Sequence, residues 1–559
     1  MKIRLLAIGL GLIALIIGCQ QELPKADLVI TNAIIWTGDE NQPMAQSMAI
    51  SGDTIMAVGS TGQITHLIGD DTEVVEAEGA FITPGFIDSH LHLMGGGNSL
   101  LSIDLRYADT PEAFSRRIGE YAKTLEPGEW ILEGNWDHTL WGGELPKKEW
   151  IDALTPDNPV AITRLDGHML LANSLALKIA GIDASTPDVE GGDIIRDERG
   201  EPTGILKDNA MDPIWPHVPS NSDAGGKAAF DAAQHYLVSN GVTSVHDMNG
   251  LDGKQGTYHY ATTARDNGEL KLRIYAVKGI RGWKQLADMV AQEGVGDKWL
   301  RIGSLKGFVD GSLGSHTALF KDPYTDQPDD HGLMVNSEED LYTWISGADK
   351  AGLHILIHGI GDRGIRTILD IYDRVAEENG PRDRRHRIEH AQHMGADDFD
   401  LFKATGTIAA AQPYHCIDDG RWAKPLIGAE RIKTTYPFKT FEEKGIPMAF
   451  GSDWPVAPAT PLEGIYAAVT RRTLDDKNPE GWVPEQKISV ETALAGYTRD
   501  AAYASFEEDI KGTLEPGKLA DFVIISADLT KVDPVTIRDL EILKTYVGGK
   551  KVYDHSETE

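Results

Sequence analysis

Phe86-Ile87-Asp88-Ser89-His90-Leu91-His92 runs as a mostly apolar strand into two histidines that are one residue apart. Side chains at positions i and i+2 of a strand point to the same face, so both imidazoles can enter one cavity. A histidine pair on a strand is more often structural than metal-binding. Whether this pair binds a metal therefore depends on which other side chains reach the same cavity.

Apolar runs alternate with amphipathic helical stretches through the middle of the chain, which is typical of a parallel α/β fold. Eight runs predict barrel strands, at residues 86–91, 242–246, 272–277, 302–309, 353–358, 387–390, 407–411 and 447–450. Helical patterns follow several of them, for example at 338–350 and 363–378. Eight strands with long crossovers predict a (β/α)8 TIM-like barrel.

The two ends of the chain show short strands and tight turns instead. Strand or hairpin patterns lie at residues 27–36, 48–58, 521–526 and 546–553. We therefore predict a small β-sandwich domain built from both termini (27–83 and 508–559), into which the barrel (84–104 and 226–507) is inserted. Residues 105–225 are too long for a loop and predict a subdomain inserted after the first barrel strand, capping the barrel mouth.

The composition limits the class of protein. The 559 residues include 53 basic and 86 acidic side chains, a formal net charge of −33, and 41% hydrophobic residues. These values exclude a multispanning membrane protein, a collagen-like chain and a disordered chain. The negative charge and the lack of a sustained Lys/Arg block argue against a nucleic-acid partner. With only Cys19 and Cys416, no disulfide framework is expected.

The first nineteen residues resemble a bacterial lipoprotein signal. Lys2 and Arg4 precede an apolar run from Leu5 to Ile17, whose helix of about 20 Å is too short for a bilayer core of about 30 Å. Cys19 follows this run directly, as in a lipobox. We predict a signal peptide (1–18), lipidation of Cys19, a tether (19–26) and a lipid-anchored place in the bacterial cell envelope. The alternative is an anchor helix that happens to contain a cysteine.

Further candidate ligands lie at the ends of the predicted strands: Lys306 in the fourth, His358 and His390 at the ends of the fifth and sixth, and Asp453 after the eighth. The C-terminal ends of barrel strands meet at one mouth, where such folds keep their chemistry. Together with His90 and His92, they offer four imidazoles and a carboxylate, a set that suits divalent metal, above all Zn²⁺.

Lys306 is out of place among metal ligands, because an ammonium group has no lone pair. Beside two divalent cations the charged form is disfavoured, and the neutral amine can add CO2. The resulting carbamate has two oxygens, enough to bridge two metals. The alternative is an ordinary ion-paired lysine.

Several strings resemble the metal-dependent amidohydrolase superfamily: residues 84–92, Lys306, His358, Arg387-Ile388-Glu389-His390 and Gly451-Ser452-Asp453. More narrowly, Asp166-Gly167-His168, residues 310–315, 358–363 and 512–522, and Gln412-Pro413 resemble its amidohydrolase-3 branch of YtcJ-like and N-substituted formamide deformylase-like proteins. The resemblance covers nearly the whole chain after the tether.

This resemblance implies a role for each residue. His90 and His92 would bind the more buried of two zinc ions, His358 and His390 the second, with Lys306 between them. Asp453 would be both a metal ligand and the catalytic proton shuttle. His168 and His316 are the candidate substrate contacts, and His316 stands where the family pattern has an arginine.

The expected reaction is hydrolysis of a C–N bond in a small amide-type substrate. A lactonase, an esterase or a mononuclear deaminase on the same fold, and a catalytically dead binding lipoprotein, remain alternatives. A homodimer also stays open, and membrane contact is expected only through the lipid anchor.

One motif competes with this interpretation. Residues 386–390 fit the H-x-x-E-H pattern, which binds zinc only on a helix. We predict a strand here, on which His386 and His390 share a face and Glu389 points away from them.

Overall fold

Eight parallel strands form the central sheet of the computed structural model, which describes residues 24–219, 222–253 and 256–557. Neighbouring strands in this sheet follow one another in the chain: β8 (Phe86–Leu91), β14 (Val242–Asp247), β15 (Arg273–Gly279), β16 (Leu300–Phe308), β17 (His354–Gly359), β18 (Arg387–His390), β19 (Ile408–Ala411) and β20 (Met448–Phe450). Each predicted strand overlaps one of these, and the predicted α/β barrel class is confirmed. The H-x-x-E-H stretch lies on β18, so the helical alternative is wrong.

The barrel closes at its mouth rather than along the whole length of its first and last strands. The Asp453 amide donates to the His90 carbonyl oxygen at 2.6 Å, and the His92 amide donates to the Trp454 carbonyl oxygen at 2.8 Å. Both bonds lie just beyond the end of β20. This closure places Asp453 directly beside the His90-Leu91-His92 segment.

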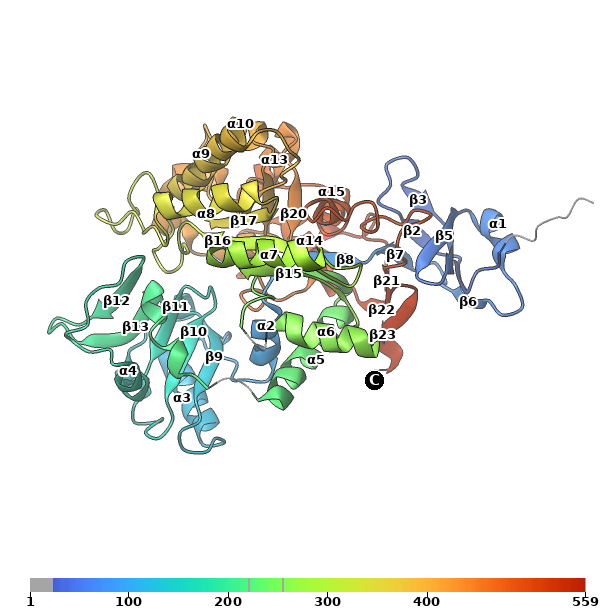
Figure 1. Cartoon of the computed structure of the whole chain (residues 1–559). Helices are drawn as coiled ribbons and strands as arrows, with labels where there is room; N and C mark the ends of the chain where they lie inside the picture. Colours follow the sequence, from blue (N-terminus) through green and yellow to red (C-terminus); the bar gives the residue numbers. More distant parts are fainter. Residues whose placement is uncertain (1–23, 220–221, 254–255, 558–559) are drawn as a thin grey trace, which may run out of the picture.

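Helices cover the outside of the barrel (Figure 1). They are α5 (Asp223–Ser239), α6 (Thr257–Asn267), α7 (Trp283–Glu293), α8 (Glu338–Lys350), α9 (Asp362–Asn379), α10 (Phe399–Ala404), α11 (Pro413–Asp419), α12 (Ala423–Arg431), α13 (Phe438–Lys444), α14 (Pro461–Thr470), α15 (Val490–Gly496) and α16 (Arg499–Tyr503). The longest, α9, buries Ile365, Ile368, Leu369 and Tyr372, the spacing of one helical face. Helix α8 begins where the Ser337 hydroxyl accepts a hydrogen bond from the Asp340 amide.

Strands from both ends of the chain build the sandwich. One sheet has the order β5 (Thr54–Gly59), β4 (Ser47–Ser51), β1 (Leu28–Thr31), β6 (Glu73–Glu76). The other has the order β23 (Lys550–Asp554), β22 (Ile542–Val547), β21 (Phe522–Ile525), β7 (Phe81–Pro84), β2 (Ile34–Trp36), β3 (Met44–Ala45). Side chains of both sheets share one hydrophobic cluster, and the short helix α1 (Thr61–Ile64) packs beside it.

The single strand predicted over residues 27–36 is wrong in detail. Asn32 has a positive φ of 52°, which turns the chain between β1 and β2. The two halves therefore enter different sheets of the sandwich.

Between β8 and β14 the chain forms α2 (Leu93–Leu100) and then a separate five-stranded sheet. Its order is β12 (Gly192–Arg196), β13 (Pro202–Asp208), β11 (Met169–Ala172), β10 (Val160–Arg164), β9 (Ile131–Trp136). With α3 (Pro111–Ala122) and α4 (Ser174–Ala180) it encloses two hydrophobic clusters of its own. We call residues 105–219 of this region the insert; Figure 1 shows it on the side of the barrel away from the sandwich. Within the described ranges, no helix combines the length and apolar character needed to cross a bilayer.

Candidate metal centre

The predicted ligands come together at the barrel mouth. His90 and His92 leave the end of β8, Lys306 projects from β16, and Asp453 follows β20. The Asp453 Oδ1 lies 3.3 Å from His92 Nε2 and 3.4 Å from His90 Nε2. The Lys306 Nζ lies 3.2 Å from the same His90 nitrogen.

The imidazoles from β17 and β18 complete the group. The ring centroids of His90 and His390 are 4.9 Å apart, and those of His358 and His390 are 4.4 Å apart. Ligand atoms of His90, His390 and Asp453 all lie within 4.8 Å of one another, close enough to share one cation.

Each of the four imidazoles has one ring nitrogen beside an oxygen acceptor. The pairs are His90 Nδ1 with Glu389 Oε2, His92 Nδ1 with Asn249 Oδ1 at 3.3 Å, His358 Nε2 with the Gly311 carbonyl at 2.9 Å, and His390 Nδ1 with Gln412 Oε1 at 2.8 Å. A histidine that donates one N–H to an oxygen keeps the lone pair of its other nitrogen for a metal. The residues present therefore fit a bound divalent cation.

Burial favours the neutral, metal-binding form of these rings. It lowers the pKa of His90, His358 and His390 well below the ordinary value, and neighbouring cationic groups add to the effect. Neutral imidazoles keep the lone pairs that a metal needs.

Burial also changes the state of Lys306. It lowers the pKa of the amine to about 8, although the nearby Glu389 and Asp453 carboxylates oppose the change. A larger fraction of neutral amine is thus available than for an exposed lysine.

The strand interpretation predicted that His386 and His390 share a face and that Glu389 points away from both. This is wrong for His390, because His386 pairs with Asp349 of α8 at 3.1 Å whereas Glu389 and His390 both lie beside His90. The Glu389 carboxylate contacts His90 Nδ1 and accepts a hydrogen bond from Arg387 at 2.8 Å. At the end of β18 His390 has a positive φ of 71°, which breaks the regular alternation of the strand. Glu389 and His390 can therefore both face the centre.

The two candidate substrate contacts differ in position. His168 lies in the insert, pairs its Nδ1 with Asp208 Oδ1 at 2.6 Å, and stands with its ring 4.9 Å from that of His358. His316 instead pairs with Asp326 at 2.9 Å and packs on Tyr324. The structure thus brings His168 to the site and turns His316 toward Asp326.

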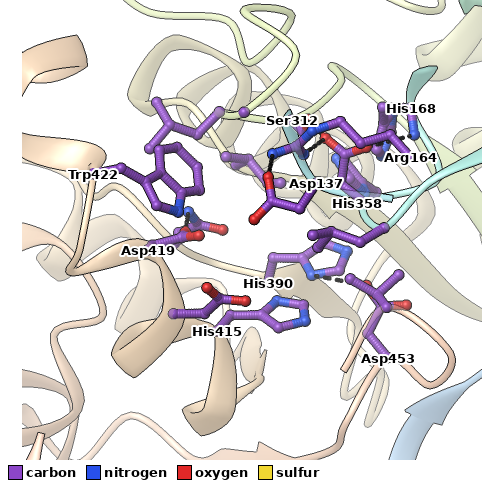
Figure 2. Close-up of a pocket in the computed structure, with 18 residues that line it drawn as sticks. Asp137, Arg164, His168, Ser312, His358, His390, His415, Asp419, Trp422 and Asp453 are labelled. Carbon is purple, nitrogen blue, oxygen red and sulfur yellow. Dashed lines mark hydrogen bonds and ion pairs between the residues drawn. The ribbon is translucent and has the colours of Figure 1, made fainter. Parts of the chain in front are cut away.

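A cavity opens from the centre and runs between barrel and insert (Figure 2). Its walls include His358, His390 and Asp453 at one end, and the insert contributes residues from β9 to β11, such as Arg164 and His168. The cavity is also lined by five residues that were not predicted from the sequence: Asp137, Arg164, Asp418, Asp419 and Trp422. A tryptophan among charged residues, in the turn before α12, was the one sequence feature that could have indicated them.

Eight parallel strands with a cluster of imidazoles, a lysine and an aspartate at their C-terminal ends define a metal-dependent hydrolase of the TIM-barrel type. The sequence profile of the amidohydrolase family (Amidohydro_3) matches residues 73–553. The chain belongs to this family, which confirms the predicted branch.

Relatives match over nearly their whole length. The protein LONG AFTER FAR-RED 3 of Arabidopsis thaliana is 41% identical over 94% of this chain and 92% of its own. The N-substituted formamide deformylase of Arthrobacter pascens is 27% identical over 95% and 99%. The crystal structure of an uncharacterized metal-dependent hydrolase from Pyrococcus horikoshii superposes with a TM-score of 0.73, at 27% identity, over 91% of this chain and 99% of that one.

Proposed function

We propose that this protein hydrolyses a C–N bond, other than a peptide bond, in a small amide-type substrate. The observation that carries the proposal is the pairing of each clustered imidazole with an oxygen acceptor, which leaves one nitrogen of each for a cation. The family membership and the name of the formamide deformylase relative support the C–N bond as the target.

The cofactor we propose is a pair of divalent cations, preferably Zn²⁺. His90 and His92 would hold one, His358 and His390 the other, with Asp453 as a further ligand and Lys306 as a bridging carbamate formed from CO2. When bound, the cations supply an acidified water and polarise the substrate carbonyl.

Asp453 moves the proton in this proposal. Burial opposes its ionisation, but contacts with His92 and the nearby Lys306 hold its pKa below the usual range, so it is a carboxylate at neutral pH. It can accept the proton that the attacking water gives up and return that proton to the leaving nitrogen, which would otherwise depart as an unstable anion.

His168 is the proposed substrate contact from the insert. Asp208 holds its Nδ1, so that the ring has a fixed orientation beside His358 and Nε2 is left for the cavity. His316 would act at the edge of the substrate path, through the loop that it fixes against Asp326.

The test is Asp453→Asn in zinc-reconstituted protein, assayed against N-formyl, N-acyl and cyclic amides. Turnover of any amide that the wild type cleaves should fall at least about 10³-fold, because the variant lacks a proton acceptor. His90→Ala should lose zinc, measured by elemental analysis, while its circular dichroism spectrum stays that of the wild type. Turnover at the wild-type rate in either variant, or cleavage of esters but no amides by the wild type, contradicts the proposal.

A further inference from the structure

One end of the cavity is rich in carboxylates. Asp419 of α11 and the indole of Trp422 lie at the end of the cavity away from Asp453 (Figure 2), and Asp137 of the insert and Asp418 of α11 also line the cavity. We call these four residues the acidic end. None of them is a proposed metal ligand or proton carrier.

Asp419 is held in a fixed orientation. Its Oδ2 accepts hydrogen bonds from the Tyr436 hydroxyl at 2.6 Å and from Gln392 Nε2 at 2.7 Å, and both donors are nearly fully buried. Among the residues that the structure describes, its Oδ1 receives no hydrogen bond and its carboxylate has no ion-pair partner. This oxygen is therefore free for a ligand in the cavity.

The two arginines near the acidic end are already paired. Arg164 donates to Asp166 at 2.6 Å and to Asp137 at 3.2 Å, and its side chain is 2% exposed. Arg421 contacts Asp418 and lies 3.7 Å from Asp137. These two guanidinium groups face four carboxylates, those of Asp137, Asp166, Asp418 and Asp419. Among the described residues Asp419 has no ion-pair partner, and burial raises its pKa to about 7, so a bound cation would favour its ionised form.

A second feature of the same cavity lies beside the proposed metal centre and also points to a ligand. The ring of His415 is 6.4 Å from that of His390 between centroids, and its Nε2 is buried without a hydrogen-bond partner in the described part of the chain. Buried polar atoms in native proteins are rarely left unpaired, so a group that enters the cavity is expected to satisfy it.

We propose that the acidic end binds a positively charged group of the substrate, and hence that the substrate is an amide carrying an ammonium, amidinium or guanidinium group. This inference rests on the proposed function. Such a group would bond Asp419 Oδ1, reduce the excess negative charge of the four carboxylates and lie against the Trp422 indole.

The net charge of the whole molecule also favours a cationic substrate over an anionic one. An anionic substrate would find both arginines occupied and would approach a chain of net charge −33. Negative potential steers cations toward the surface and repels anions. A neutral substrate would leave the Asp419 carboxylate buried and unpaired in the complex, which is unfavourable.

Matched amide pairs test the proposal. N-(4-aminobutyl)formamide and N-pentylformamide have the same length and differ in a terminal ammonium or methyl group; 5-aminopentanamide and hexanamide place the charge on the acyl side. In at least one pair kcat/KM should be about 10- to 100-fold higher for the charged member, as expected for a hydrogen bond to a charged group. Asp419→Asn should lower kcat/KM for the charged member and so remove this preference.

The control variant is Asp400→Asn, whose carboxylate is exposed on α10 and pairs with Lys444 outside the cavity. It should keep the wild-type preference. Equal rates for the two members of both pairs in the wild type, or an Asp419→Asn variant that slows both members alike, overturns the proposal.

A binding measurement separates this inference from the proposed function. The probe N-(4-aminobutyl)methanesulfonamide contains no amide to hydrolyse, and calorimetry should show it binding at least about 10-fold more tightly than N-pentylmethanesulfonamide. If no amide is cleaved but this preference is present and lost in Asp419→Asn, the proposed reaction is wrong and the cation site stands. If amides are cleaved without either preference, the cation site is wrong and the reaction stands.

Discussion

Glu389 is a buried carboxylate that orients His90, one of the proposed metal ligands. It contacts His90 Nδ1 and is itself fixed by Arg387, which also donates to the Ser89 carbonyl at 2.7 Å and lies 2.9 Å from His246 Nδ1. A carboxylate in this position fixes the ring orientation and raises the basicity of the nitrogen that faces the cation.

We therefore predict that Glu389→Gln lowers zinc affinity about 10- to 100-fold, because an amide keeps the contact but loses the charge. Competition with a chromophoric chelator measures the dissociation constant. Glu443→Gln, at an exposed position on α13, should bind zinc as the wild type does. Equal zinc affinity of the two variants would mean that the charge of Glu389 does not affect metal binding.

His393 gives a prediction about pH. It is buried between Thr435 Oγ1, 2.9 Å from Nδ1, and Gln392 Nε2, 3.0 Å from its own Nε2. Burial, assisted by Arg431, lowers its pKa to about 3, whereas the unfolded chain takes up the proton near pH 6.5. The stability that the neutral ring contributes is present above pH 6.5 and is lost as the pH falls toward 3.

The free energy of unfolding in urea should reveal this loss. Between pH 6 and pH 4 the advantage of the wild type over His393→Gln should shrink by about 1.4 kcal/mol per pH unit, because glutamine does not titrate. A metal chelator keeps metal release from contributing to the measured free energy. The titration of the other histidines is the same in both proteins and cancels in the comparison. Parallel pH profiles of the two proteins would disprove the assignment.

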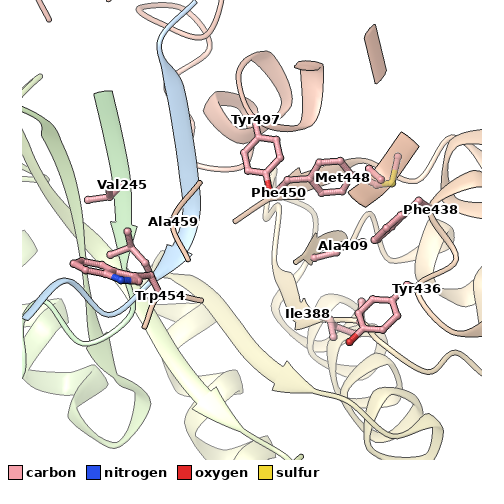
Figure 3. Packing of buried hydrophobic residues seen from close by; sticks show 14 of the residues in the cluster. Val245, Ile388, Ala409, Tyr436, Phe438, Met448, Phe450, Trp454, Ala459 and Tyr497 are labelled. Carbon is pink, nitrogen blue, oxygen red and sulfur yellow. The ribbon is translucent and has the colours of Figure 1, made fainter. Parts of the chain in front are cut away.

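At the scale of elements, strands enclosed by a core were predictable and irregular turns were not. Most barrel strands contain a short apolar run whose residues pack against apolar helices, although β18 (Arg387–His390) is mainly charged and polar. Phe450 of β20, for example, lies 5.4 Å from Phe438 and 5.6 Å from Tyr497 between ring centroids (Figure 3). Periodicity reports such packing directly. It does not report a positive φ at a non-glycine residue, and so the turn at Asn32 was missed.

The same distinction applies to the site. His90, His92, Lys306 and Asp453 were found because they lie at strand ends, where topology alone brings residues together. The partners of His92 and His390, Asn249 and Gln412, are single loop residues, and His358 pairs with the Gly311 backbone carbonyl, which any residue could supply. The lining from the insert depends on how two separate cores meet, and no local pattern contains that information.

A buried ion pair joins the barrel and the sandwich, beside apolar side chains of both parts that pack together. Arg273 of β15 donates to both oxygens of Asp521 before β21, at 2.6 and 2.8 Å, and stacks on Trp299. Because both side chains are buried, removing one leaves an uncompensated charge, which costs about 3–5 kcal/mol.

We predict that Arg273→Met lowers the free energy of unfolding by about this amount, measured by urea denaturation. Arg273→Met combined with Asp521→Leu should recover most of the loss, since no charge remains unpaired. A double variant as unstable as the sum of its single variants would show that Asp521 acts through its bond to the Gly548 amide instead.

At the scale of the whole molecule, the three parts have separate tasks. The barrel holds the proposed cations, the insert supplies a wall of the cavity, and the sandwich ties the two ends of the chain together. Strand β1 begins on the sandwich, on the opposite side of the barrel from the insert (Figure 1). A tether attached before β1 would therefore place the sandwich near a membrane and leave the cavity facing the surrounding fluid.

Cys19 lies outside the described residues, and its lipidation and the envelope location remain our proposal. Cys19→Ser should move the protein, expressed in a bacterium, from the membrane fraction to the soluble fraction and abolish labelling by radioactive palmitate, because the thiol that would carry the lipid is gone. Cys416→Ser is the matched control: its thiol is buried in the barrel, so this variant should stay labelled and membrane-bound. Labelling of Cys19→Ser protein would show that the lipid is attached elsewhere. Unlabelled wild type in the soluble fraction would show that the protein carries no lipid anchor.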